Sequence, residues 1–457
     1  MRSHAAGTGQ SHGDDERPPT MPHDSRPPTG ATEAALADYL DAQHQLRCMI
    51  GDPLAGTDAA LADAPGFVMA HAFRAYLHLL GTEPAGVEVA RESLRNASAL
   101  GGTDAERAHL TAIEHLVEGR WHAAGRVLED VAIADPHDAV ALQIGHQIDF
   151  FTGSSRMLRD RIARALPAWD ESMPGYHALL GMHAFGLEET GDYARAEAQG
   201  RRALELQPRD TWAKHAVAHV LEMQGRLDEG VEWMTTDHED WSVDSFFSVH
   251  NWWHLSLYLL ELGDTDRVLA LYDDPIQGGV SEVTLDMLDA SALLWRLHLA
   301  GVDVGDRWEA IADRWMPLAG AGNYTFNDAH AMMAFVGSGR SSAAQEVLAA
   351  QAEAMNRTDD NAAFTREVGG PVARAVLAFG EGDYDETVSL LRPVRTIAHR
   401  FGGSHAQRDL LDLTLLEAAC RAGQDQVAAA LAAERLAWKP QSPLTRRYAA
   451  RTGLVGV

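Results

Sequence analysis

The sequence has few cysteines, no strand-like segments and no long apolar run. Only Cys48 and Cys420 occur in 457 residues, and neither a CxxC motif nor a Cys/His zinc-finger spacing is present. A disulfide framework is therefore not expected, and a reducing compartment is the default. No apolar stretch approaches the roughly 18 residues of a membrane span. Alternating runs rich in Val, Ile and Thr are also missing, which indicates an all-α chain.

Basic residues are scarce relative to acidic ones. Lys and Arg number 38 against 66 for Asp and Glu, so the formal net charge is -28. Nucleic acids and anionic membranes are bound through basic patches, so no nucleic-acid partner and no membrane partner is expected. The hydrophobic fraction of 46% is sufficient for a large buried core. Together these features predict a cytoplasmic protein.

The first thirty residues differ from the rest of the chain. They read "MRSHAAGTGQSHGDDERPPTMPHDSRPPTG" and are rich in Pro, Gly, Ser and charge. Because the segment lacks an apolar core, it is not a secretory signal. Its composition predicts a disordered tail over residues 1–30, before a repeat region over residues 31–457. Met21 lies inside this tail and is a second possible start beside Met1.

Glycines punctuate the helical pattern at a nearly regular interval. Each ends one apolar helix just before another begins, with spacings of 34 to 43 residues: Gly81, Gly119, Gly153, Gly191, Gly225, Gly263, Gly301, Gly339, Gly382 and Gly423. This period is typical of helix-turn-helix repeats, in which a left-handed glycine forms the turn. The stretch "GDYARAEAQGRRALELQPRD" looks like the second half of a tetratricopeptide repeat. The sequence therefore predicts an α-α superhelix (solenoid) of about ten degenerate tetratricopeptide-like hairpins around a concave face.

Two successive first helices carry an HxxxH pair, in "AKHAVAHVLEMQG" and "HNWWHLSLYLLELGD". Residues four apart share a helix face, and the tetratricopeptide register directs His215, His219, His250 and Trp253 inward. His254 falls near the edge of that face and is expected to support the others. At least three of the four histidines should converge.

The histidine pairs have three interpretations. They could pack and hydrogen-bond, form a small-molecule site, or chelate zinc, since imidazole pairs at i, i+4 bind one ion. Neither pair has the glutamate of an HExxH motif, and no nearby carboxylate ligand was identified. We therefore predict no metal and no cofactor, with zinc as the less favoured alternative.

Polar residues also interrupt later apolar helices. Asp286 and Asp289 in "TLDMLDASALLWRLH" are best explained by helix N-terminal placement. In "YTFNDAHAMMAF", Asn327, Asp328 and His330 are either capping groups or site residues.

A third polar insert lies near the C-terminus, in "FGGSHAQRDLLDLTL". His405 and Asp409 are four residues apart, with Arg408 beside them. Such a pair orients an imidazole and raises its basicity, or else is an ordinary surface pair. Upstream, Glu367 precedes a Gly-Gly-Pro break.

Motifs for nucleophilic or nucleotide chemistry are missing. No GxSxG, P-loop or GxGxxG occurs, and the cysteines lack a catalytic signature. Any catalysis must rest on His, Asp, Glu and Arg as acids, bases and anion ligands.

Six blocks resemble, in this order, the motifs of the tetratricopeptide repeat protein 38-like family. They are "HAVAHVLEMQGR", "HNWWHLSLYLLELGD", "LDASALLWRL", "FNDAHAMMAF", "REVGGP" and "GGSHAQRDLLDLTL", and the resemblance covers about residues 35 to 450. It implies a soluble, intracellular array of degenerate helical repeats, and it lends no reaction. The site residues it implies are His215, His219, His250, His254, Asn327, Asp328, His330, Glu367, His405, Arg408 and Asp409.

The favoured hypothesis is a small-molecule-binding protein or a cofactor-independent acid/base enzyme. It would catalyse hydrolysis, elimination or isomerisation of a small polar substrate. The expected catalytic residues are His250, His405, Asp409, Asp328 and His330. The expected substrate-binding residues are His215, His219, Trp252, Trp253, His254, Asn327, Glu367 and Arg408.

Two alternatives stay open. One is a tetratricopeptide scaffold that binds a peptide or protein partner in its concave groove. The other is a metal-binding protein with His215, His219 and His250 as ligands. Convergence of the histidines in an enclosed pocket favours the small-molecule hypothesis, whereas their spread along an open groove favours the scaffold.

Overall fold

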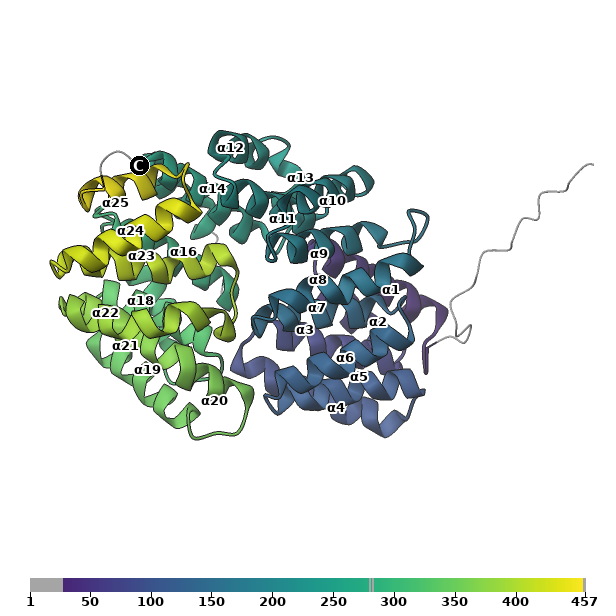
Figure 1. Ribbon diagram of the computed structural model, residues 1–457. Helices are drawn as coiled ribbons and strands as arrows, with labels where there is room; N and C mark the ends of the chain where they lie inside the picture. Colours follow the sequence, from purple (N-terminus) through teal and green to yellow (C-terminus); the bar gives the residue numbers. More distant parts are fainter. Residues whose placement is uncertain (1–27, 279–280, 282, 455–457) are drawn as a thin grey trace, which may run out of the picture.

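A computed structural model of the chain describes residues 28–278, 281 and 283–454 (Figure 1). The predicted tail lies almost entirely outside these residues, as do both possible starts, Met1 and Met21. Within the described residues every regular element is a helix, which confirms the all-α prediction. None of these helices combines the length and the apolar character needed to cross a membrane.

Helical hairpins follow one another along the chain. The hairpins are α1 (Glu33–Cys48) with α2 (Pro53–Asp63), α3 (Val68–Leu80) with α4 (Pro84–Leu100), α5 (Asp104–Val117) with α6 (Trp121–Ala134), α7 (Ala139–Phe151) with α8 (Ser155–Ala165), α9 (Tyr176–Glu188) with α10 (Tyr193–Leu206), α11 (Thr211–Met223) with α12 (Leu227–Thr235), α14 (Ser248–Leu262) with α15 (Thr265–Leu271), α16 (Thr284–Leu299) with α17 (Arg307–Trp315), α18 (Thr325–Gly337) with α19 (Ser341–Ala354), α21 (Gly370–Glu381) with α22 (Tyr384–Val394), and α23 (His405–Arg421) with α24 (Asp425–Trp438). Outside the hairpins lie α13 (His238–Ser242), α20 (Asp360–Phe364) and α25 (Pro443–Arg451), together with short 3₁₀ or π turns at Leu166–Ala168, Tyr272–Ile276, Met316–Leu318, Thr365–Gly369 and Arg395–Phe401.

The turn glycines act as predicted at nine of the ten positions. From Gly119 to Gly423 each has a positive φ, the conformation that glycine adopts without steric cost. Gly81 is the exception, because its φ is -67° and the next residue, Thr82, takes the left-handed conformation instead.

First helices and second helices form two layers. Nearly every residue of α11 and α18 is buried, whereas α10 and α12 bury only a narrow stripe of residues. A helix buried on all sides belongs to the interior, and a helix buried on one side belongs at the surface. The first helices are therefore the inner wall of the superhelix.

The superhelix closes on itself. The N-terminal and C-terminal halves of the chain lie on opposite sides of Figure 1, and hydrogen bonds join segments of the two halves. The Asn323 amide donates to the carbonyl of Thr82 (2.9 Å), and the Asp360 amide donates to the carbonyl of Gly119 (3.0 Å). The Tyr324 hydroxyl is placed to donate to the Phe151 carbonyl (3.0 Å). The two halves of the chain are consequently joined across the concave face.

Closure depends on a backbone approach that only glycine permits. Gly153 has a φ of +67°, and a Cβ there would clash with the carbonyl oxygen of His399 across the closure. Gly191 has a φ of +84°, but a Cβ there would meet nothing within 4 Å. Both alanine variants incur the cost of a left-handed alanine, and only Gly153→Ala adds the clash. We expect Gly153→Ala to lower the free energy of unfolding by about 1–2 kcal/mol more than Gly191→Ala, as measured by urea unfolding. Equal losses would contradict this account of the closure.

The predicted break at Gly-Gly-Pro does not form. The chain stays helical from α20 through a π turn at Thr365–Gly369 into α21. Pro371 lies in the first turn of α21, where its missing N–H is tolerated, and a π turn absorbs the misfit. Gly369 is needed because a Cβ there would clash with the Thr325 side chain.

Candidate functional site

A cavity of about 510 Å³ lies inside the superhelix, between the N-terminal hairpins and the helices α11, α14, α16 and α23. Most of its wall is apolar. The apolar lining includes Leu46, Met49, Leu77, Leu80, Phe150, Phe151, Trp212, Phe246, Phe247, Leu285 and Leu288. Because these residues come from both halves of the chain, the cavity exists only in the closed superhelix.

One side of this central cavity is a polar cluster of His215, His250, Asp286 and Asp289. Other elements add the polar lining residues Asp52, His78, Gln147, Ser404 and Gln407. The Nδ1 atom of His250 lies 2.9 Å from Asp289 Oδ2, so His250 donates its Nδ1 hydrogen to the carboxylate and keeps Nε2 as an acceptor. Asp289 was expected to serve the helix N-terminus; it instead orients a histidine.

All four histidines of the two HxxxH pairs converge behind this polar side. His215 Nε2 lies 2.9 Å from His219 Nε2 and 3.1 Å from His250 Nε2. The rings of His219 and His254 have centroids 4.4 Å apart. One ring nitrogen from each histidine lies within 4.8 Å of the other three. The expected convergence therefore holds, and His254 is a full member rather than an edge residue.

Adjacent helices and aromatic packing fix the imidazoles. His215 and His219 share a face of α11, and His250 and His254 share a face of α14, the next first helix. The indole of Trp253 stacks on His250 with a centroid separation of 5.3 Å and an interplanar angle of 17°. His219, His254 and Trp253 are fully buried, so their side chains have little freedom to reorient.

Two further carboxylates lie behind the cluster. Glu188 Oε2 is 3.7 Å from His219 Nδ1, and Glu222 Oε2 is 3.5 Å from His254 Nδ1. Glu222 also lies 3.4 Å from the ammonium of Lys439. Three of the four imidazoles are thus faced by a buried carboxylate on the Nδ1 side.

Burial controls the electrostatics of this region. It lowers the pKa of His215, His219 and His254 well below the usual value, and neighbouring histidines lower it further. Burial, with Glu189 and Glu222 nearby, raises the pKa of Glu188 well above its usual value. Burial also raises the pKa of Asp286 to about 6, helped by the charge of Asp289. Burial therefore favours the neutral form of the His215, His219 and His254 imidazoles.

Asn327, Asp328 and His330 do not line the central cavity. The Asn327 amide donates to the Thr82 hydroxyl (3.0 Å), and Asp328 accepts from Gln351 (3.4 Å). The Nδ1 atom of His330 is 2.8 Å from the carbonyl of Phe326, its own i−4 neighbour. Asn327 and Asp328 therefore connect α18 to other segments of the wall, whereas the His330 contact stays within α18.

The expected His405–Asp409 pair does not form. His405 contacts Glu189, with its backbone N–H donating to Glu189 Oε1 (2.7 Å), and Arg408 Nη2 lies 3.2 Å from Glu189 Oε2. Asp409 instead forms a bidentate ion pair with Arg435. The spacing correctly places His405 and Asp409 on one helix face, but their charged partners are Glu189 at the end of α9 and Arg435 of α24.

His405, Arg408 and Asp409 line a second cavity of about 440 Å³, together with Glu189 and Trp438. Burial alone would raise the pKa of Asp409, but Arg435, Lys439 and Arg296 lower it far below the usual range. A carboxylate so firmly ionised is a poor proton acceptor. Asp409 is therefore an anion held by buried cations, and it does not orient His405.

Trp252 and Glu367 lie away from the histidines. Trp252 packs on Trp241 of α13, with centroids 4.6 Å apart, on the outer side of α14. Glu367 is exposed and pairs with Arg400 at 2.6 Å. Trp253 does not line the central cavity either, and the aromatic side chains that do include Trp212 and Phe247.

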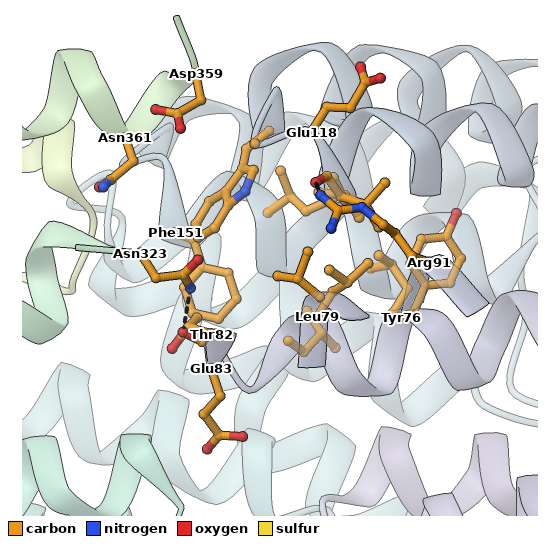
Figure 2. A pocket seen from close by; sticks show the side chains of 18 of the residues that line it. Tyr76, Leu79, Thr82, Glu83, Arg91, Glu118, Phe151, Asn323, Asp359 and Asn361 are labelled. Carbon is orange, nitrogen blue, oxygen red and sulfur yellow. Dashed lines mark hydrogen bonds between the residues drawn. The ribbon is translucent and has the colours of Figure 1, made fainter. Parts of the chain in front are cut away.

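A third cavity, of about 280 Å³, lies between the two halves of the chain and contains none of the predicted residues (Figure 2). Asn323 and Asp359 approach it from one side, and Tyr76 and Arg91 from the other. The Arg91 guanidinium donates to the carbonyl of Val117 and pairs with Glu88. Its charge is therefore already matched, and the cavity mainly marks the closure.

Helical spacing also marks Glu188 and Glu222, two residues near the histidines that were not predicted. His215, His219 and Glu222 lie at i, i+4 and i+7, so they share one face of α11. Glu188 and Glu222 each stand three residues before a turn glycine. No comparable local signal marks Trp212 or Phe247 as cavity residues.

No family model matches the sequence. The resemblance to the tetratricopeptide repeat protein 38-like family therefore stays an expectation. Among solved structures, the chain is similar to that of Naa15/Naa10 bound to HypK-THB, with 12% identity over 93% of this chain and 67% of that chain and a TM-score of 0.26. A likeness at this level carries no argument about function, and the fold assignment stands on the helices described above.

Proposed function

We propose that the protein binds a small molecule in the central cavity and performs acid/base chemistry on it. The observation that supports this is a largely apolar chamber whose lining includes the polar cluster His215, His250, Asp286 and Asp289. Small-molecule sites have this composition, and a volume of about 510 Å³ falls in their usual range.

The cavity suggests the character of its ligand. Trp212, Phe247 and Leu288 provide an apolar surface, whereas the carboxyl of Asp286 and the imidazole of His250 lie on the polar side. A ligand with an apolar body and one polar group would be held in a single orientation. Proton transfer at that polar group would support hydrolysis, elimination or isomerisation.

Filling the cavity tests the binding site. Leu285 lies in its wall, and Leu269 is a half-buried leucine of α15 that lines none of the three cavities described above. A library of small molecules would be screened for ligands that raise Tm of the wild type. We expect Leu285→Trp to abolish the shift from each such ligand and Leu269→Trp to retain it. Equal shifts in the two variants would place the ligand elsewhere.

The proton-transfer role is tested at Asp286. With a substrate identified by the screen, Asp286→Asn should retain binding and lower kcat by about 100-fold, because the amide cannot exchange a proton. Asp313→Asn, an exposed change on α17, is the control. Unchanged kcat in Asp286→Asn would remove this residue from the chemistry.

A scaffold that binds a peptide or protein is the second candidate. Two exposed apolar side chains, Phe246 and Val283, lie at the rim of the cavity, with 43% and 45% of their surface exposed. A partner held at this rim should be lost in Phe246→Ser or Val283→Ser. Leu285→Trp should weaken binding of this partner less than it weakens binding of a small molecule in the cavity. This difference separates the two candidates.

A further inference from the structure

We infer that His215, His219, His250 and His254 form a binding site for a divalent transition-metal ion of the zinc class. The inference stands on the four histidines themselves. Only the use of the ion in chemistry at the cavity rests on the proposed function.

The positions of the ring nitrogens support an ion. In a tetrahedral zinc site the Zn–N bond of about 2.0–2.1 Å places neighbouring nitrogens about 3.3 Å apart. The separations of 2.9 Å and 3.1 Å around His215 Nε2 are close to this value. The fourth donor comes from His254, whose two ring nitrogens are buried and have no hydrogen-bond partner.

Hydrogen bonding alone does not satisfy the cluster. A neutral imidazole nitrogen carries either one hydrogen or one lone pair. Asp289 takes the Nδ1 hydrogen of His250, so a lone pair of His250 points at His215 Nε2. His215 Nε2 also faces His219 Nε2 and can make one good hydrogen bond, not two. A cation accepts all of these lone pairs at once.

The carboxylates behind the histidines strengthen the inference. Metal-binding histidines usually donate their other N–H to a carboxylate, which orients the ring and raises its basicity. Asp289, Glu222 and Glu188 lie 2.9, 3.5 and 3.7 Å from the Nδ1 atoms of His250, His254 and His219. Both oxygens of Glu188 are buried without a hydrogen-bond partner. A dipositive ion among the imidazoles would favour the ionised form of these buried carboxylates.

The donor set limits the identity of the ion. Four imidazoles without a directly coordinating carboxylate suit Zn²⁺, Co²⁺, Ni²⁺ or Cu²⁺ and disfavour Mg²⁺ and Ca²⁺. His215 and His250 also line the central cavity, whereas His219 and His254 lie deeper. An additional coordination position on the cavity side would be within reach of a ligand.

Zinc uptake by the full-length, tag-free protein tests the site. The chelator-treated wild type is expected to take up one equivalent of Zn²⁺, measured by mass spectrometry of the metal after gel filtration, and to gain in Tm. X-ray absorption at the zinc edge of this sample should show imidazole scattering. Uptake below one tenth of an equivalent, or zinc without imidazole ligands, would overturn the inference.

Variants localise the ion. His219→Gln and His254→Gln each remove a donor without altering the cavity wall and should lower zinc affinity by at least about 100-fold. Glu222→Gln keeps all four donors and should lower it about 10-fold to 100-fold. His330→Gln, a buried histidine outside the cluster, and Cys48→Ser, in a separate group with His44 and His177, should bind as the wild type does. Affinities of His219→Gln and His254→Gln equal to that of the wild type would refute the site.

The outcome is independent of the small-molecule screen. A zinc-loaded protein to which no small molecule binds would overturn the proposed function and leave the metal site intact. A protein that takes up no zinc and still binds a ligand in the cavity would overturn the metal site and leave the proposed function intact.

Discussion

Replacing Asp409 by alanine is expected to lower the free energy of unfolding by about 3–5 kcal/mol. Asp409 lies at the centre of three buried cations. Arg435 binds it in a bidentate pair with one contact at 2.8 Å, and Lys439 and Arg296 lie 3.6 and 3.9 Å away. Removing the anion leaves these cations buried and mutually repelling. The loss would be measured by urea unfolding at pH 7.

Asp412→Ala is the matched control, since Asp412 lies on the same helix one turn later. Its partner Arg395 is 2.8 Å away, and both side chains are about a third exposed. Solvent-exposed pairs contribute little, so the expected loss is below about 1 kcal/mol. Similar losses in the two variants would show that the buried network does not depend on Asp409.

The repeat architecture was largely readable from the sequence, because each repeat obeys local rules. A left-handed glycine at a helix end, such as Gly191 or Gly225, can be predicted from spacing and turn chemistry. Closure was not predictable. It depends on contacts such as Thr82 with Asn323, whose partners are 241 residues apart, and no local pattern specifies them.

The sequence predicted part of the candidate site. Helical spacing correctly placed His215, His219 and His250 on facing surfaces of neighbouring helices, because each HxxxH pair defines its own face. Spacing misjudged His254, since the exact rotation of α14 depends on its tertiary packing, in which Trp252 contacts Trp241 and Trp253 stacks on His250. It also paired His405 with Asp409, although Glu189 and Arg435 compete for those two side chains across the closed interior.

These differences share one physical reason. In an open solenoid each helix contacts its sequence neighbours, so sequence reading suffices. In the closed form the inner faces of α9, α11 and α14 also meet α23 and the segment around Lys439. Buried charges are then matched between distant repeats, which a single repeat does not reveal.

A second prediction concerns pH, because one carboxyl of the closed wall is buried without a cation at hydrogen-bonding distance. Asp328 is 6% exposed and accepts a hydrogen bond from Gln351. Burial raises its pKa to about 7, with Gln351 and Arg357 opposing the shift. In the unfolded chain the pKa is about 3.9. The folded state therefore binds more protons between these values, and Asp328 lowers stability progressively as pH rises toward 7.

The variant Asp328→Asn should remove this pH dependence, since an amide keeps the shape and still accepts from Gln351. Relative to the wild type, its free energy of unfolding is expected to rise by roughly 2.5 kcal/mol between pH 5 and pH 8. Urea unfolding at pH 5, 6, 7 and 8 measures the difference, in which all other titrating groups cancel.

Asp360→Asn is the control, for which the change in stability is expected to have the opposite sign. Although burial raises the pKa of Asp360, hydrogen bonds from His122 lower it below the usual value, so that variant should lose stability at neutral pH. A difference between Asp328→Asn and the wild type that is flat with pH would show that Asp328 is ionised throughout.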